Sequence, residues 1–238
     1  MRIRLLCAVL FLAVPMASSF AADCSGLPSA TELQRYLNTA PSVETPIGGL
    51  FGGTLMWGAI VNRDGEICAF ITSTADPKKV WPGSQAIAKA KAYTANAFSN
   101  DALPLSTARL YTFTQPGHSL WSLGQSNPFS PFFLAPPDGR GGGKDQIAGG
   151  LIFFGGGVPL YSGGRIVGGL GISGDTSCAD HEIAKRVRTL AGMDPPGGAE
   201  VDDIWYPLDG PSVFMHPYCL STYRNGIFVG TETAVKSY

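Results

Sequence analysis

The chain has no long apolar run beyond its first twenty residues, and it contains only three histidines. A membrane-spanning helix needs about 18 uninterrupted apolar residues, so we expect no transmembrane segment. The motifs GxSxG, HExxH and CxxC are absent, which leaves acyl transfer, metalloprotease and dithiol chemistry without a motif. The glycine triplets at 141–143 and 155–157 lack the lysine followed by Ser/Thr of a P-loop, so a nucleotide site is set aside.

Positive charge is also scarce, with 17 Lys and Arg against 18 Asp and Glu and no basic run. Nucleic acids and anionic membrane surfaces are bound mainly through clustered basic side chains. We therefore expect neither as a partner.

The first residues have the pattern of a secretory signal peptide. Arg2 and Arg4 precede an apolar run from Leu5 to about Val14, and Ser19-Phe20-Ala21 fits the small-x-small cleavage rule. We expect residues 1–21 to be removed and the mature protein to be periplasmic or secreted. The mature chain then has 15 basic and 18 acidic residues, a formal charge of −3.

Local patterns predict an α+β protein. Ser29 and Glu32 form a capping-box pattern, and Asp64-Gly65 between two apolar runs indicates a hairpin. Helices are expected at 29–37, 83–100 and 177–190, and strands at about 54–62, 66–73, 150–154, 158–161 and 165–172. This order predicts an antiparallel sheet with flanking helices in a single domain, residues 22–238, which includes a C-terminal extension from about 195.

Several motifs resemble those of one known family. The string GGGVPLYSGGRIVGGLGISGDTSCADHEIAKRV (155–187) resembles the signature of the GlcG/HbpS-like haem-binding family, which is sometimes called haem-degrading. VNRDGEICAF, WPGSQAIAKAKAYTANAFS and LSTARLYTFTQPGHSLWSLGQSNP resemble its other landmarks in the same order. The resemblance covers roughly residues 24–191. It implies a profilin-like fold, assembly into closed homo-oligomers and an affinity for haem, but no settled enzymatic activity.

Two Cys/His clusters are the most informative feature for function. Cys178-x-x-His181 lies in the first turn of the last long helix, and His216-x-x-Cys219 repeats the spacing in reverse. The apolar stripe of that helix leaves Cys178 displayed outward. An even cysteine count in an exported chain favours disulfides. We predict a Cys178–Cys219 disulfide that tethers the C-terminal extension, and a second between Cys24 and Cys68.

The alternative for these clusters is a zinc site made by Cys178, His181, His216 and Cys219. A disulfide would also bring His181 and His216 together, where two neutral imidazoles could bind haem iron or another transition metal. In the simpler interpretation, each histidine only hydrogen-bonds a loop.

The irregular stretch 101–146 provides a second candidate site. His118, Tyr111 and Trp121, with Phe129, Phe132 and Phe133 further on, could wall a haem pocket. The alternative is a self-packed loop or a subunit contact. Lys91 and Arg109 could pair with haem propionates; alternatively, Lys89 and Lys91 form the solvated face of their helix.

These patterns predict an exported protein that binds haem or another tetrapyrrole for sequestration, delivery or sensing. No catalytic residue is indicated. The alternatives are haem degradation or another small-molecule reaction at the same surface, and a structural oligomeric interaction module.

Overall fold

The computed structural model describes residues 23–129, 147 and 149–233. The expected signal peptide, together with Phe132 and Phe133, lies outside these residues. Among the described residues, no helix combines the length and apolar character needed to cross a membrane.

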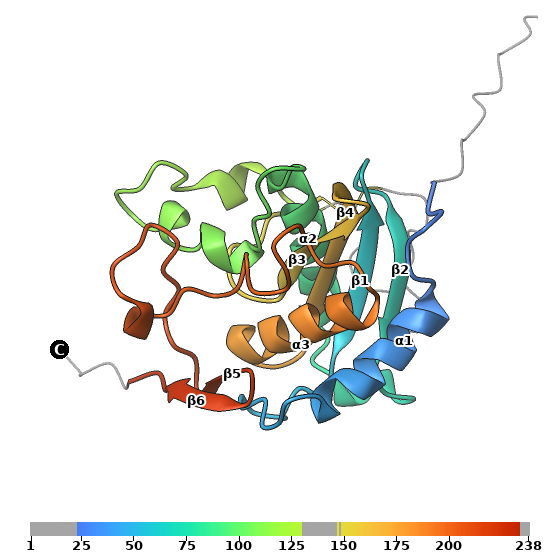
Figure 1. Ribbon diagram of the computed structural model, residues 1–238, viewed down its shortest axis with the longest axis horizontal. Coiled ribbons are helices and arrows are strands. Elements are labelled where there is room, and N and C mark those ends of the chain that lie inside the picture. The colour runs from blue at the N-terminus through green and yellow to red at the C-terminus, as the bar shows by residue number, and fades with distance from the viewer. Residues whose placement is uncertain (1–22, 130–146, 148, 234–238) are drawn as a thin grey trace, which may run out of the picture.

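The central feature is a four-stranded antiparallel sheet in the order β2-β1-β4-β3 (Figure 1). Its strands are β1 (Trp57–Asn62), β2 (Ile67–Thr72), β3 (Gly157–Ser162) and β4 (Arg165–Ser173). The helices are α1 (Ala30–Thr39), α2 (Ser84–Phe98) and α3 (Ser177–Leu190), and a second small sheet pairs β5 (Thr222–Arg224) with β6 (Ile227–Gly230). Short 3-10 helices occupy Ala40–Ser42, Pro77–Lys79, Thr107–Leu110, Thr112–Thr114, Leu123–Ser126 and Pro207–Asp209. The predicted α+β class and the antiparallel sheet with flanking helices are confirmed.

Local signals set most of these elements. The Ser29 hydroxyl accepts from the Glu32 amide while the Glu32 carboxylate accepts from the Ser29 amide, which is the predicted capping box. Tight turns join β1 to β2 and β3 to β4, and the second contains Gly163 and Gly164 with positive φ. The predicted boundaries of α3 agree with the structure.

The two faces of the sheet are packed differently. Helices α1 and α3 cover one face (Figure 1), where Leu33 and Ile183 of the helices belong to the same aliphatic core as Leu170 of β4. Helix α2 covers the other face at very short range, because β4 presents glycines there. A Cβ at Gly171 would lie 2.0 Å from the Ala88 carbonyl oxygen, so the glycine-rich sequence of β4 is what permits this contact.

Two sequence expectations about burial and strands are wrong. Residues 150–154 form no strand, because Ile152 donates to the Thr94 hydroxyl and its neighbours pack along α2. Lys89 and Lys91 are buried rather than solvated. Cys178 lies away from the apolar stripe of α3, as expected, and is buried there by the C-terminal segment (residues 195–233) that it tethers.

Candidate functional site

The C-terminal segment is fastened to the start of α3 by a disulfide. Cys178 and Cys219 are bonded with their Cα atoms 5.9 Å apart, and Cys24 and Cys68 form a second disulfide with Cα atoms 5.5 Å apart. Both predicted pairings are therefore present. With the sulfurs of Cys178 and Cys219 joined, neither is a thiolate, and zinc ligation by these cysteines would require reduction first.

Buried ion pairs hold the same segment against α3. The Arg188 guanidinium donates to both carboxylate oxygens of Asp202, at 2.9 and 2.7 Å, and neither side chain is exposed. Lys185 Nζ lies 2.7 Å from Asp203 Oδ2. The position of the segment is thus determined by specific charge partners.

The two histidines of the Cys/His clusters contact neighbouring glycines. The Gly156 amide donates to His181 Nδ1 at 3.4 Å, and the Gly155 amide donates to His216 Nε2 at 3.3 Å. His181 Nε2 lies 3.3 Å from Asp203 Oδ1. Each imidazole therefore has a structural role of the kind that the simpler interpretation described.

His216 is a neutral, buried imidazole. Its Nδ1 lies 2.8 Å from the Pro217 carbonyl oxygen, which acts only as an acceptor. This contact places the ring hydrogen on Nδ1 and leaves the lone pair on Nε2. Burial lowers the pKa of His216 to about 4, although the Pro217 carbonyl acts in the opposite direction.

Lys91 is committed to a different partner from the one the sequence suggested. Its Nζ donates to Asp180 Oδ2 at 2.7 Å and to the Ile172 carbonyl at 2.9 Å, and it lies 5.0 Å from the centre of the Phe154 ring. Both charged groups are buried, and this burial raises the pKa of the Asp180 carboxyl to about 6. Lys91 is therefore enclosed within the fold and is not displayed to a ligand.

An aromatic groove lies beside the Cys178–Cys219 disulfide. It has a volume of about 470 Å³ and is open on one side. Its lining includes Trp81, Tyr111, Phe154, His216, Tyr218 and Leu220. The rings of Tyr111 and His216 are 5.0 Å apart, and Trp81 packs edge-on against Phe51 at 5.5 Å. Among the described residues that line it, Glu232 is the one charged side chain.

The other sequence candidates do not line this groove. His118 is exposed, and Trp121 is 55% exposed. The Arg109 side chain donates to the Asp203 carbonyl at 2.9 Å and lies over the Phe214 ring. Of the aromatic loop candidates that the structure describes, Tyr111 alone reaches the groove.

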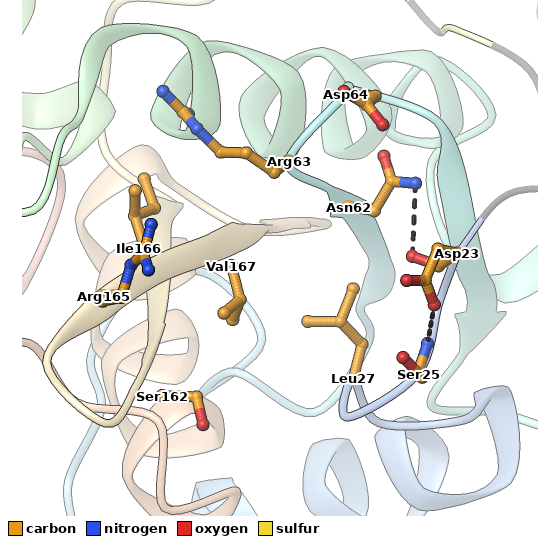
Figure 2. A pocket seen from close by; sticks show the side chains of 10 residues that line it. All are labelled: Asp23, Ser25, Leu27, Asn62, Arg63, Asp64, Ser162, Arg165, Ile166 and Val167. Atoms are coloured by element: carbon orange, nitrogen blue, oxygen red, sulfur yellow. Dashed lines mark hydrogen bonds between the residues drawn. The ribbon is translucent and has the colours of Figure 1, made fainter.

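Figure 2 shows a second cavity, of about 400 Å³, at the opposite end of β4. Polar contacts close one side of it, where Asn62 donates to the Asp23 carbonyl at 3.4 Å and the Ser25 amide donates to the Asp23 carboxylate at 3.0 Å. Arg165 on another side is largely exposed. The lining has neither aromatic walls nor an imidazole, so the groove beside the disulfide is the better candidate site.

Sequence reasoning missed Trp81, Phe154 and Tyr218 as groove residues. Tyr218 lies inside the HPYC cluster that was singled out, and Phe154 directly precedes the glycine triplet at 155–157. For Tyr218 and Phe154, the signal available in the sequence was the adjacent motif, HPYC or the glycine triplet. Their convergence depends on contacts between segments far apart in the chain.

The model of the family described as "Haem degrading protein HbpS-like" matches residues 53–188. The chain belongs to this family. The matched region of this HbpS-like chain runs from just before β1 almost to the end of α3, and His216 and Cys219 lie beyond it.

Solved structures similar to this HbpS-like chain include a PduOC:heme complex, with 23% identity, a TM-score of 0.46, and coverage of 71% of this chain and 94% of that chain. HbpS itself has 19% identity, a TM-score of 0.45, and coverage of 76% and 98%. The Klebsiella pneumoniae protein ORFY has 20% identity, a TM-score of 0.47, and coverage of 68% and 87%. No curated protein matches the chain.

Proposed function

We propose that this protein binds haem or a closely related tetrapyrrole in the aromatic groove and acts by sequestration, delivery or sensing. The observation that carries the proposal is the combination of HbpS-like family membership with a groove that joins aromatic walls to one neutral imidazole. One solved structure similar to this chain is a complex with heme.

The groove residues fit such a ligand in shape and donor chemistry. Ligand pockets typically measure about 300–1,000 Å³ and are mostly apolar with few polar groups, and a volume of about 470 Å³ lies in this range. Trp81, Tyr111 and Phe154 supply aromatic surface, while His216 is the candidate axial donor. Its Nε2 would have to exchange the hydrogen bond from the Gly155 amide for the bond to iron. A hydrogen bond from the second ring nitrogen to a backbone carbonyl, as from His216 Nδ1 to Pro217, is usual for metal-binding histidines.

The propionate partners that the sequence suggested have other roles in the fold. Lys91 pairs with Asp180, and Arg109 donates to the Asp203 carbonyl. No lysine or arginine is among the described residues that line the groove. Recognition in this proposal therefore depends on the aromatic walls and the imidazole, with the propionates left to solvent.

A hemin titration of the oxidised, mature protein tests the proposal. We expect a saturable shift of the Soret band and saturable tryptophan quenching at micromolar hemin. Trp81→Phe should remove most of the quenching, because Trp81 lines the groove. Trp121→Phe is the matched control, since Trp121 is 55% exposed against 47% for Trp81 but lies outside the groove lining.

The histidines supply a second matched pair of variants. His216→Asn should weaken hemin binding tenfold or more, and His118→Asn should leave it unchanged. Circular dichroism and thermal unfolding would show that the His216 variant is folded. Absence of both the Soret shift and the quenching in the natural protein, or an equal effect of the two histidine variants, would contradict the proposal.

Haem turnover is the second candidate function, and the family description favours it. Hemin bound to the protein would then lose its Soret band with reductant or peroxide faster than free hemin does. Catalase should not abolish the loss that the reductant drives. A stable Soret band under both conditions would leave binding as the function.

The proposal includes export and self-association. Two disulfides and the N-terminal sequence support an oxidising compartment. Mass spectrometry of the protein from its host should give a mature N-terminus at Ala22. Light scattering should give a closed homo-oligomer, and a monomeric mass would contradict that part of the proposal.

A further inference from the structure

Two hydrogen-bonding groups surround Cys219 Sγ in the Cys178–Cys219 disulfide. The Cys178 backbone amide donates to Cys219 Sγ at 3.1 Å, and Ser177 Oγ lies 3.2 Å from the same sulfur. Both groups belong to the first turn of α3, a helix of 14 residues. Cys219 Sγ therefore lies at the positive end of a helix dipole.

The second disulfide provides the contrast. Cys24 joins the N-terminal segment to Cys68 in β2, and among the described residues no hydrogen bond is made to either sulfur. No helix begins at either cysteine. The donors at Cys219 are thus specific to one of the two disulfides.

These donors stabilise the reduced form of Cys178–Cys219. Hydrogen bonds to a charged acceptor are roughly twice as strong as those to a neutral one, so the Cys178 amide and the Ser177 hydroxyl interact more strongly with a Cys219 thiolate than with the disulfide sulfur. A disulfide whose reduced form is stabilised is more easily reduced.

A dithiol reductant can reach this bond from the groove. Both cysteines are buried, but Cys219 retains 8% exposure and lines the groove, whereas Cys178 is 1% exposed. A thiolate of the reductant attacks Cys219 Sγ, and Cys178 leaves as a thiolate that takes up a proton. The second thiol of the reductant then attacks its own sulfur in the mixed disulfide and releases Cys219. The reductant becomes a disulfide. The protein gains two electrons and one proton, which is held by Cys178, while Cys219 stays a thiolate and the second proton of the dithiol goes to solvent.

Reduction frees two sulfurs beside an imidazole. The ligand atoms of Cys178, His216 and Cys219 all lie within 4.8 Å of one another. Two thiolates and one imidazole are a ligand set typical of Zn²⁺, and three protein ligands leave a fourth position for water or another ligand. His181 does not belong to this cluster, so the set has three members and differs from the four-residue zinc site considered from the sequence.

We propose that the Cys178–Cys219 disulfide is redox-active and that its reduced form, with His216, binds one Zn²⁺ ion beside the aromatic groove. This inference does not depend on haem binding. The oxidised protein offers no thiolate at this place, so metal binding depends on the redox state of the disulfide.

Metal titration of the reduced protein tests the site. The protein is reduced with dithiothreitol, which is then removed without oxygen, and Co²⁺ is added as a spectroscopic probe. We expect thiolate-to-cobalt absorption at one ion per chain, its replacement by Zn²⁺, and no absorption with the oxidised protein. Native mass spectrometry should show the corresponding single Zn²⁺ adduct.

Matched variants separate this site from the other cysteines. Cys24→Ser/Cys68→Ser should still bind one ion after reduction, and Cys178→Ser/Cys219→Ser should bind none. His216→Asn should weaken binding at least tenfold. Equal binding by the two double variants, or no binding by the reduced natural protein, overturns the proposal. Loss of the fold on reduction, both with and without Zn²⁺, overturns it as well.

A redox titration tests the reducibility independently of any variant. The natural protein is equilibrated in dithiothreitol buffers of graded potential, then alkylated and mapped by peptide mass spectrometry. Cys178–Cys219 should open at a less reducing potential than Cys24–Cys68, and the reverse order would refute this part. Hemin titration of the oxidised protein gives a separate result, so failure of the zinc site and failure of the haem proposal are distinguishable.

Discussion

The sheet and the C-terminal segment are stabilised by different kinds of interaction. The sheet and its helices are held by close-packed aliphatic side chains on one face, and by aromatic side chains and glycine-mediated contact with α2 on the other. The C-terminal segment is held to α3 by a disulfide and by buried charges such as Arg188–Asp202 and Lys185–Asp203.

This difference has consequences for the site. Apolar packing tolerates small changes of shape, whereas a buried charge requires its partner at a specific position. His216 and Cys219 both belong to the C-terminal segment. The groove is therefore formed where a stable apolar frame meets a segment whose attachment depends on charge pairing and redox state.

The largest predicted effect is removal of one buried charge. Arg188→Met leaves Asp202 buried without its partner, so we expect a loss of about 3–5 kcal/mol in the free energy of unfolding. Urea denaturation measures it. Arg165→Met removes an exposed arginine whose ion pair with Asp101 spans 3.8 Å, and should change stability by less than about 0.5 kcal/mol. Equal losses would show that the buried pair has no special role.

The next effect compares the two disulfides. They close loops of similar length, with sequence separations of 44 and 41 residues. Cys24→Ser/Cys68→Ser and Cys178→Ser/Cys219→Ser should therefore each lose about 2–4 kcal/mol. Hemin affinity should fall in the second variant alone, because only that disulfide borders the groove. Thermal unfolding and hemin titration measure the two effects, and parallel changes in affinity would contradict this assignment.

A smaller loss is expected from crowding the apolar frame. The Cβ of Gly171→Ala would meet the Ala88 carbonyl oxygen at 2.0 Å, and overpacking of this kind costs about 1–3 kcal/mol. Gly83→Ala is the matched control, since its Cβ would enter open space. Chemical denaturation of both variants tests the prediction. A neutral Gly171→Ala would mean that α2 moves easily away from the sheet.

The smallest predicted effect depends on pH. Burial lowers the pKa of Lys89 to about 8 from its ordinary value of 10.5, so the charged form destabilises the folded state. This penalty falls progressively as pH rises from about 8 toward 10.5. Between pH 7 and 9 the natural protein should gain about 0.5–1 kcal/mol relative to Lys89→Met, after allowance for solvent screening. Unfolding curves of both proteins at several pH values test this; a constant difference would contradict it.

Particular residues show how far the sequence could predict the site. The pairing of Cys178 with Cys219 followed from the placement of Cys178 away from the apolar stripe and from the even cysteine count, and the structure contains it. The same argument placed Cys178 away from the apolar stripe of α3, and there the C-terminal segment that it tethers covers it. Lys91 was expected on a solvated helix face. In the structure its ammonium group is buried and donates a hydrogen bond to Asp180, which is 89 residues away in the chain.

By itself the sequence determined the helices, the two hairpins of the main sheet, the disulfide partners and the family. Capping residues, turn glycines and the spacing of hydrophobic residues act over a few positions, so they can be recognised in the sequence. Only the tertiary structure decided which charged side chains are buried, why residues 150–154 leave the sheet, and where Trp81, Phe154 and His216 meet. Those outcomes depend on long-range partners, because burial of a charge or an imidazole is favourable only when a specific group from a distant segment compensates for the lost water.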